Sequence, residues 1–336
     1  MPGRTPAGDG PPGDLSRAVR EPSVFPFPPG GHLQTILPAI LRRVSVVTRT
    51  RERIATPDGD FLDLDWAERT GCGRLVILTH GLEGSSSNAC VQGMAAAFRR
   101  AGWDALAWNL RGCSGEPNRL LRSYHSGSTD DLGAVIAHAA QTYDRIALVG
   151  FSLGGNITLK YLGDAGEAVD ARIVGAAAFS VPCDLASSAR HLESPANRIY
   201  MRHFLCGLRK KIRDKARMFP GWVSEEGLCQ MRTFREFDGA YTAPMNGFLS
   251  AEDYWERASS RPVLGRIRVP ALLVNARNDP FLPPECYPED AAGSGHFQME
   301  APRHGGHIGF FALARHGEFW SESRAVAFIG RMAERS

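Results

Sequence analysis

Short apolar runs alternate with longer amphipathic segments over most of this chain. Runs rich in valine, isoleucine, leucine and alanine predict buried strands, and apolar residues three or four positions apart predict helices. Strands are expected at residues 44–55, 61–66, 74–79, 104–109, 145–149, 172–180, 269–275 and 296–300, and helices at 32–38, 91–100, 129–143 and 321–332. The polar turn at 57–60 predicts that the first two strands form an antiparallel hairpin.

After the hairpin, strands and helices alternate, which predicts an α/β fold. This order is typical of a mostly parallel sheet with helices on both faces. Right-handed connections place the carboxyl ends of the parallel strands along one edge of the sheet, where functional sites form. We therefore expect the chemistry of this protein at the ends of its strands.

The alternation also predicts how the chain is divided. Residues 1–31, rich in proline and glycine, are expected to be a disordered lead-in. Residues 32–183 and 262–336 are expected to form two parts of one core. Between them, residues 184–261 are mostly helical in pattern and contain no convincing core strand, so we interpret them as an inserted cap.

One predicted cap helix is strongly amphipathic and basic. Met201, Phe204, Leu205, Leu208 and Ile212 fall on one face, and Arg209, Lys210, Arg213 and Arg217 fall on the other. A helix of this kind usually packs through its apolar face and leaves the basic face in solvent. It can also lie on an anionic membrane, so the pattern keeps peripheral membrane contact through the cap as an alternative.

The segment at 150–155, GFSLGG, follows a predicted strand and opens a predicted helix at 156–162. This arrangement is typical of a nucleophile elbow, a turn so tight that only glycines fit two residues either side of the serine. The turn holds the hydroxyl of Ser152 clear of the backbone, near the positive end of the helix dipole. Ser152 is therefore the candidate nucleophile.

A serine nucleophile needs a base, and the base needs an acid that orients it. Asp279 comes just after the predicted strand at 269–275, and His307 lies in a glycine-rich loop after the last short strand. The chain order Ser, Asp, His is that of the serine enzymes built on such sheets. Asp184 is an alternative acid, although it also suits the cap position of a helix, and His304 is an alternative base.

Acyl transfer also needs donors for the oxyanion that develops in the transition state. The strand at 74–79 ends in the segment HGLEGSS at 80–86, from which Leu82 is the expected backbone donor. The second donor is the N–H of Leu153, directly after the nucleophile. We interpret His80 as a scaffold for this turn, and we expect Glu83 to bind backbone or cap.

Two further loop segments, 111–118 and 123–127, follow a strand at the same edge. Tyr124 and His125 are candidates for contact with the substrate. The alternative is that these segments only build the loop, with Arg111 in an ion pair.

Composition excludes several classes of function. The net charge of +3 is small for 336 residues, and no nucleic-acid motif or P-loop is present. No stretch approaches the roughly 20 apolar residues of a membrane span. The seven cysteines lack metal-ligand or redox spacing, so we expect reduced thiols in a cytoplasmic protein without a metal.

Taken together, the motifs resemble the α/β-hydrolase superfamily, and specifically its YheT-like esterase branch, from about residue 32 to the end of the chain. The segments that carry the resemblance are HLQT at 32–35, HGLEGSS at 80–86, RGCSG at 111–115, YHSG at 124–127, GFSLGG at 150–155, TFREFD at 233–238, YTAP at 241–244, NDPF at 278–281 and GGHIGF at 305–310.

The resemblance implies an eight-stranded core, a triad of Ser152, Asp279 and His307, and hydrolysis of carboxylic esters without metal or cofactor. Relatives in this branch include medium-chain phospholipases, so acyl esters or lipids are the expected substrates. The membrane-anchoring helix of the animal relatives has no counterpart in this sequence. A thioesterase or acyltransferase with the same triad, and a non-catalytic binding protein on a hydrolase scaffold, are the alternatives, and the oligomeric state stays open.

Overall fold

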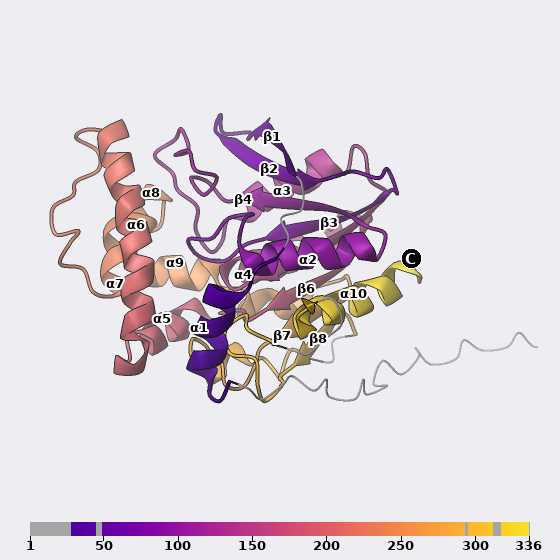
Figure 1. The fold of residues 1–336 in the computed structure, drawn as a ribbon. Helices are drawn as coiled ribbons and strands as arrows, with labels where there is room; N and C mark the ends of the chain where they lie inside the picture. Colours follow the sequence, from indigo (N-terminus) through magenta and orange to yellow (C-terminus); the bar gives the residue numbers. More distant parts are fainter. Residues whose placement is uncertain (1–27, 45–48, 293–294, 312–316, 336) are drawn as a thin grey trace, which may run out of the picture.

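A computed structural model describes residues 28–44, 49–292, 295–311 and 317–335 of the chain. Residues 1–27 of the lead-in predicted at 1–31, and positions 45–48 of the first predicted strand, lie outside these residues. The last position of the predicted lead-in, Gly31, is the first residue of a helix. The centre is an eight-stranded sheet with the order β1-β2-β4-β3-β5-β6-β7-β8 (Figure 1). The strands are β1 Arg49–Ala55, β2 Phe61–Ala67, β3 Arg74–Thr79, β4 Asp104–Asn109, β5 Arg145–Phe151, β6 Ile173–Phe179, β7 Ala271–Val274 and β8 Phe297–Glu300.

The predicted hairpin and the mostly parallel sheet are both confirmed. Strand β1 pairs with β2 in antiparallel fashion, and β2 pairs with β4 in the same way. From β4 to β8 every neighbouring pair is parallel. The carboxyl ends of these six strands therefore lie along one edge.

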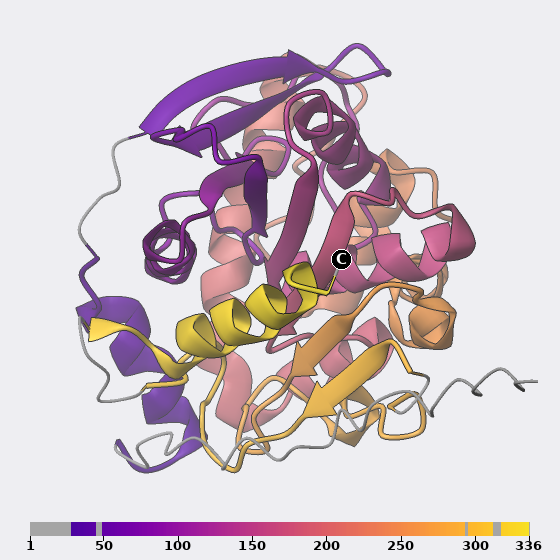
Figure 2. The same ribbon diagram turned by 90° about the vertical axis from the view of Figure 1, so that its right-hand side faces the viewer.

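Helices cover both faces of the sheet, as predicted. On one face lie α2 (Ala89–Arg100) and α10 (Trp320–Ala333), and on the other lie α3 (Thr129–Ala139) and α4 (Leu153–Ala165) (Figures 1 and 2). Strand β3 shows why both faces are apolar, since Leu75 and Ile77 pack into one core cluster while Val76 and Leu78 pack into the other. Alternate side chains of a strand point to opposite faces, so a strand covered on both sides is apolar throughout.

The region between β6 and β7 is helical and lies beside the sheet (Figure 1). We call its helices the cap helices: α5 Leu185–Leu192, α6 Arg198–Met218, α7 Phe234–Phe237, α8 Ala243–Met245 and α9 Ala251–Ala258. A π-helical turn, Asp238–Thr242, joins α7 to α8. Short 3-10 turns lie at Gly166–Ala168, Pro195–Asn197, Arg261–Arg266 and Pro284–Cys286.

The amphipathic prediction for α6 holds on its apolar face and fails in part on its basic face. Met201, Leu205 and Ile212 are buried, as expected. Arg209, expected in solvent, instead turns toward the loop after α6 and donates to the carbonyl of Leu228 at 3.2 Å. The carbonyls of this loop supply acceptors that a helical periodicity does not reveal.

Several helix boundaries differ from the prediction, among them the ends of α1 and α3. Helix α1 spans Gly31–Leu41 and continues three residues past Pro38, to the point where the N–H of Arg42 bonds to the carbonyl of Pro38. Helix α3 ends at Ala139 rather than at 143. Beyond it the chain tightens into a turn, in which the N–H of Thr142 bonds to the carbonyl of Ala139 at 3.0 Å.

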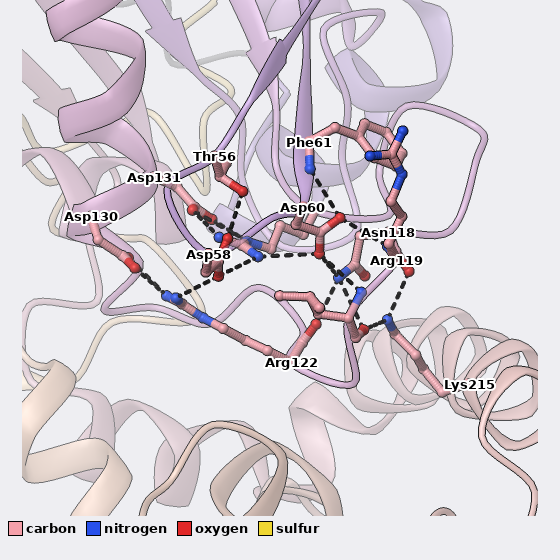
Figure 3. A network of polar contacts seen from close by, with 12 residues as sticks. Thr56, Asp58, Asp60, Phe61, Asn118, Arg119, Arg122, Asp130, Asp131 and Lys215 are labelled. Atoms are coloured by element: carbon pink, nitrogen blue, oxygen red, sulfur yellow. Dashed lines mark hydrogen bonds and ion pairs between the residues drawn. The ribbon is translucent and has the colours of Figure 1, made fainter.

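A buried charge network fixes the loop between β4 and α3 (Figure 3). The Arg111 guanidinium bonds to Asp131 at 2.7 Å and to Asp60 at 3.1 Å, so Arg111 does form the ion pair considered as its structural role. Asn118 also donates to Asp60, at 2.6 Å. From the cap, Lys215 of α6 donates to the carbonyl of Asn118 at 3.0 Å. The network therefore ties the cap to the core loop that carries Tyr124 and His125.

Candidate active site

Ser152 lies in the sharp turn between β5 and α4, at the centre of the carboxyl edge of the sheet. Its backbone angles are φ 52° and ψ −120°, a conformation that non-glycine residues rarely adopt. Such backbone costs about 1–3 kcal/mol and is retained mainly at functional sites. The conformation is that expected of a nucleophile elbow.

The glycines of the GFSLGG segment are there because the backbone is crowded on all sides. A Cβ on Gly154 would overlap the carbonyl oxygens of Thr79 and His80. A Cβ on Gly150 would lie 2.6 Å from the Cα of Gly155, and no side chain fits at that distance. The turn can therefore press against the end of β3 only with glycine at these positions.

Ser152, His307 and Asp279 meet at this edge. Nε2 of His307 lies 3.0 Å from Oγ of Ser152, and Nδ1 of His307 lies 2.9 Å from Oδ2 of Asp279. The structure thus brings a hydroxyl, an imidazole and a carboxylate into one chain of hydrogen bonds. These are the distances at which a base can accept the proton of a nucleophile.

Asp279 is buried and firmly held. Besides its contacts to His307, its Oδ1 accepts a hydrogen bond from the N–H of Phe281 at 2.9 Å. The alternative acid, Asp184, instead caps helix α5 and accepts from the N–H of Ser187 at 2.9 Å. The ring of His307, rather than that of His304, faces Ser152.

The loop that carries His307 is supported by helix α1, a contact that sequence reasoning missed. The N–H of His307 donates to Oγ1 of Thr35 at 2.8 Å, and the N–H of Gly305 donates to Oε1 of Gln34 at 2.8 Å. Gly306 has φ 53°, and a Cβ there would lie 2.7 Å from the carbonyl oxygen of Gly31. Within the HLQT segment at 32–35, Gln34 and Thr35 therefore hold this loop, whereas the sequence predicts only a helix and a family resemblance there.

The turn after β3 lies directly beside the nucleophile. A Cβ on Gly81 would lie 3.2 Å from the Cβ of Ser152. Among the described residues, the N–H groups of Leu82 and Leu153 have no hydrogen-bond acceptor. Both groups are therefore available to a ligand atom near Ser152, as an oxyanion hole requires.

His80 supports this turn through two hydrogen bonds to backbone groups. Its Nδ1–H donates to the carbonyl of Gly81 at 2.8 Å, and its Nε2 accepts from the N–H of Leu110 at 3.1 Å. Burial lowers the pKa of His80 to about 4, so the ring is neutral near pH 7. A neutral ring suits the hydrogen bond that His80 accepts, and it suits the scaffold role predicted for it.

Glu83, in the same turn, connects the core to the cap. Its backbone is at φ 54°. The hydroxyl of Tyr124 accepts from the N–H of Glu83 at 3.1 Å and donates to its carboxylate at 2.6 Å. Lys211 of α6 brings its Nζ within 3.5 Å of that carboxylate. A Cβ on Gly207 of the same helix would overlap a carboxylate oxygen of Glu83, so the helix can approach the turn this closely only with glycine there.

A cavity of about 110 Å³ opens over Ser152, between the core and the cap helices. Its walls are mostly apolar and aromatic, with Leu82, Leu153, Pro182, Leu185, Ala189, Leu192, Phe204, Leu208, Phe234, Trp255 and Phe281 among the lining residues. A mostly apolar cavity with a few convergent polar groups is typical of a small-molecule site. The cavity therefore has room for the apolar part of a ligand next to the hydroxyl of Ser152.

Tyr124 and His125 both line this cavity. Their contact with the substrate stays a prediction. The hydroxyl of Tyr124 is engaged by Glu83. The ring of His125 accepts from the N–H of Gly127 at 3.1 Å and packs edge-on against Tyr254. Burial lowers the pKa of His125 to about 3, which keeps this ring neutral.

Two further residues that line the cavity, Phe281 and Asp238, belong to segments that carry the family resemblance. The ring centroid of Phe281 lies 4.1 Å from that of His307, so the phenyl ring covers one side of the imidazole. Asp238 adds a carboxylate to the cap side of the cavity. Their sequence signal was only membership in the NDPF and TFREFD segments, because nothing local shows that these side chains turn into a cavity.

Within the described ranges, no cluster of three or more His, Cys, Asp or Glu side chains could hold a metal ion. The same part of the chain contains no helix that is both long and apolar enough to span a membrane.

A strained serine elbow at the carboxyl edge of a mostly parallel sheet, with a histidine and an aspartate from later loops, defines the α/β-hydrolase class. The family model described as alpha/beta hydrolase fold matches residues 74–312. The Escherichia coli (strain K12) protein named "Putative esterase YheT" is 36% identical over 87% of this chain and 88% of its own length. This chain therefore belongs to the α/β-hydrolase family and groups with YheT.

Two further matches have lower sequence identity. Phospholipase ABHD3 of Mus musculus is 29% identical over 82% of this chain and 70% of its own length. The structure of esterase Pf2001 of Pyrococcus furiosus matches with a TM-score of 0.55 at 16% identity, covering 85% of this chain and 93% of that chain. At that identity the likeness shows a shared fold.

Proposed function

We propose that this protein is a serine esterase that hydrolyses carboxylic esters through an acyl-enzyme intermediate. Ser152 is the nucleophile, His307 the general base and Asp279 the group that orients the imidazole. The observation that supports the proposal best is the hydrogen-bonded chain from Oγ of Ser152 through His307 to Asp279, at 3.0 and 2.9 Å. A serine hydroxyl is a weak nucleophile until such a base takes its proton.

In the first half of the reaction, His307 takes the proton of Ser152 as Oγ attacks the ester carbonyl. The carbonyl oxygen becomes an oxyanion and accepts hydrogen bonds from the N–H groups of Leu82 and Leu153. The tetrahedral intermediate then collapses, the bond to the alcohol oxygen breaks, and His307 gives its proton to the leaving alcohol. An acyl group remains on Ser152.

In the second half, His307 takes a proton from water, and the hydroxide attacks the acyl carbonyl. The bond to Oγ breaks, the carboxylic acid leaves, and the proton returns from His307 to Ser152. Asp279 stays ionised throughout and stabilises the imidazolium that forms twice in the cycle. No step in this sequence requires a metal or a cofactor.

The names of the relatives support esters of fatty acids as the substrate class. They include the mouse phospholipase ABHD3 and a monoacylglycerol lipase of Saccharomyces cerevisiae. The apolar cavity beside Ser152 suits an acyl chain. We therefore propose short- to medium-chain acyl esters, lipids among them, as the substrates.

The decisive experiment is Ser152→Ala. We expect a loss of about 10³-fold or more in kcat on p-nitrophenyl butyrate, and loss of labelling by a fluorophosphonate probe. Ser323→Ala, on the exposed side of α10, is the control and should keep both. If the purified, folded Ser152→Ala protein kept its rate, the proposed mechanism would be wrong.

A further inference from the structure

The cap wall of the cavity carries a carboxylate that the proposed chemistry does not use. Asp238 begins the π-helical turn Asp238–Thr242 and lines the cavity together with Ser152 and His307. Its exposed fraction is only 8%. Because π-helical turns are rare and occur frequently at functional sites, this one invites a functional explanation.

Among the described residues, no cationic side chain pairs with this carboxylate. Its oxygens accept hydrogen bonds from Oγ1 of Thr242 at 2.7 Å and from Nε1 of Trp255 at 2.9 Å. In the part of the chain that the structure describes, no lysine, arginine or histidine lies within ion-pair distance of Asp238, and the cavity is lined by no lysine or arginine. A carboxylate offers about four lone-pair positions, so about two remain for a ligand.

The hydroxyl groups in the described walls already have protein partners. The hydroxyl of Ser126 bonds to Tyr254 at 3.0 Å, and that of Ser188 contacts the thiol of Cys286 at 3.1 Å. The hydroxyl of Tyr124 is engaged by Glu83. Outside the triad, Asp238 is therefore the one described lining residue that combines a formal charge with spare acceptor capacity.

The surroundings of Asp238 favour an organic cation. Phe234, Tyr254 and Trp255 line the same cavity, and aromatic faces attract ammonium groups. Burial raises the pKa of Asp238 to about 6, against the hydrogen bonds from Thr242 and Trp255, which lower it. The carboxylate is thus mainly ionised near pH 7, and a buried charge without a partner is costly unless a ligand pairs with it.

We propose that Asp238 binds a protonated amino group of the ester substrate. The proposal rests on the esterase function, since it specifies which esters that same site takes. An N–H of the amine donates to the free lone pairs of the Asp238 carboxylate, while the ester carbonyl lies at Ser152. The aliphatic part between them packs against the apolar walls of the cavity.

The test compares amino esters with carbon isosteres of the same shape, near pH 7. In the acyl series, p-nitrophenyl 4-(dimethylamino)butyrate is compared with p-nitrophenyl 5-methylhexanoate. In the alcohol series, 3-(dimethylamino)propyl butyrate is compared with 4-methylpentyl butyrate. We expect kcat/KM for the amino ester to exceed that of its isostere about 10-fold or more in one series, because a charge-assisted hydrogen bond forms with the amine alone.

Asp238→Asn should reduce that ratio about 10-fold, since it removes the charge at nearly constant shape. Asp238→Ser serves the same purpose if the asparagine variant does not fold. The control is Glu252→Gln, an exposed acid on α9, which should leave the ratio as it is. Expressing the result as a ratio removes any general effect of a variant on the triad.

A ratio near one in both series would overturn the proposal, and so would a preference for the amino ester that survives in both Asp238 variants. Either result could occur while Ser152→Ala still abolishes hydrolysis of the isosteres. Failure of the amine site is therefore distinguishable from failure of the esterase function itself.

Discussion

Oγ1 of Thr35 accepts a hydrogen bond from the N–H of His307 at 2.8 Å, across 272 positions of the chain. The same hydroxyl donates to the carbonyl of Gly31 at 2.7 Å, so it is fixed in direction. Helix α1 therefore acts as a support for the loop that carries the proposed base.

Thr35→Val should lower kcat by about 10- to 100-fold with little change in KM, because a small displacement of a catalytic group is costly. Valine keeps the shape of threonine but leaves the N–H of His307 without its acceptor. Steady-state kinetics on p-nitrophenyl butyrate measures the effect, and Thr50→Val, on the exposed side of β1, is the control. An unchanged kcat in Thr35→Val would show that the loop holds His307 without α1.

Lys211 and Glu83 make a second connection to the site, at 3.5 Å, between α6 and the turn that contains Leu82. The carbonyl of Gly112 also accepts from Lys211, at 2.7 Å. Lys211→Met should lower kcat about 10-fold, because the turn that presents an oxyanion donor loses an anchor. Lys210→Met, which changes the exposed neighbour of Lys211, should have no such effect.

A double-mutant cycle with Glu83→Gln shows whether the pair acts as a unit. If it does, the double variant should be little worse than either single variant, because the same contact is lost in each. Independent, additive losses in kcat would contradict the tether.

These two supports mark the limit of what the sequence can predict. The strand that ends at Phe151 and the elbow at Ser152 were predictable because their signals are local: an apolar run, and glycines at fixed distances from a serine. Asp279 and His307 could be named because strand order places their loops at the same edge. The contact of Thr35 with His307 joins the two ends of the fold, and no local pattern encodes it.

Helix α6 shows the same limit for a buried charge. Periodicity identified its apolar face correctly, yet Lys215 is buried among loop carbonyls, including that of Asn118. Burial lowers the pKa of Lys215 to about 8, so the ammonium is held at some cost by backbone acceptors from the core. A helical pattern distinguishes apolar from polar faces, but it cannot show that a polar side chain meets a partner from another part of the chain.

The crowding at the elbow predicts a large effect of one methyl group. Gly154→Ala should destabilise the protein by about 3 kcal/mol or more, because its Cβ would overlap two carbonyl oxygens at the end of β3, those of Thr79 and His80. Gly330→Ala in α10 is the matched control, since a Cβ there meets no atom within 4 Å. That variant should gain up to about 1 kcal/mol from helix propensity. Urea unfolding measures both, and equal stabilities would contradict the packing described for Gly154.

His80 predicts a dependence of stability on pH. Burial lowers its folded-state pKa to about 4, whereas in the unfolded chain an ordinary histidine takes up its proton near pH 6.5. The stability that neutral His80 contributes is therefore complete above about pH 6.5 and is lost as the pH falls through about 4. Between about pH 7 and about pH 5 the loss should be about 2 kcal/mol. His80→Gln cannot take up a proton, so its unfolding free energy, measured in urea at both pH values, should fall by that much less than that of the unchanged protein. All other titrating groups, His125 among them, are present in both proteins and cancel in the difference.

Equal losses in the two proteins would mean that His80 is protonated in the folded state as readily as in the unfolded chain. The hydrogen bond that His80 accepts from Leu110 would then not hold the ring neutral.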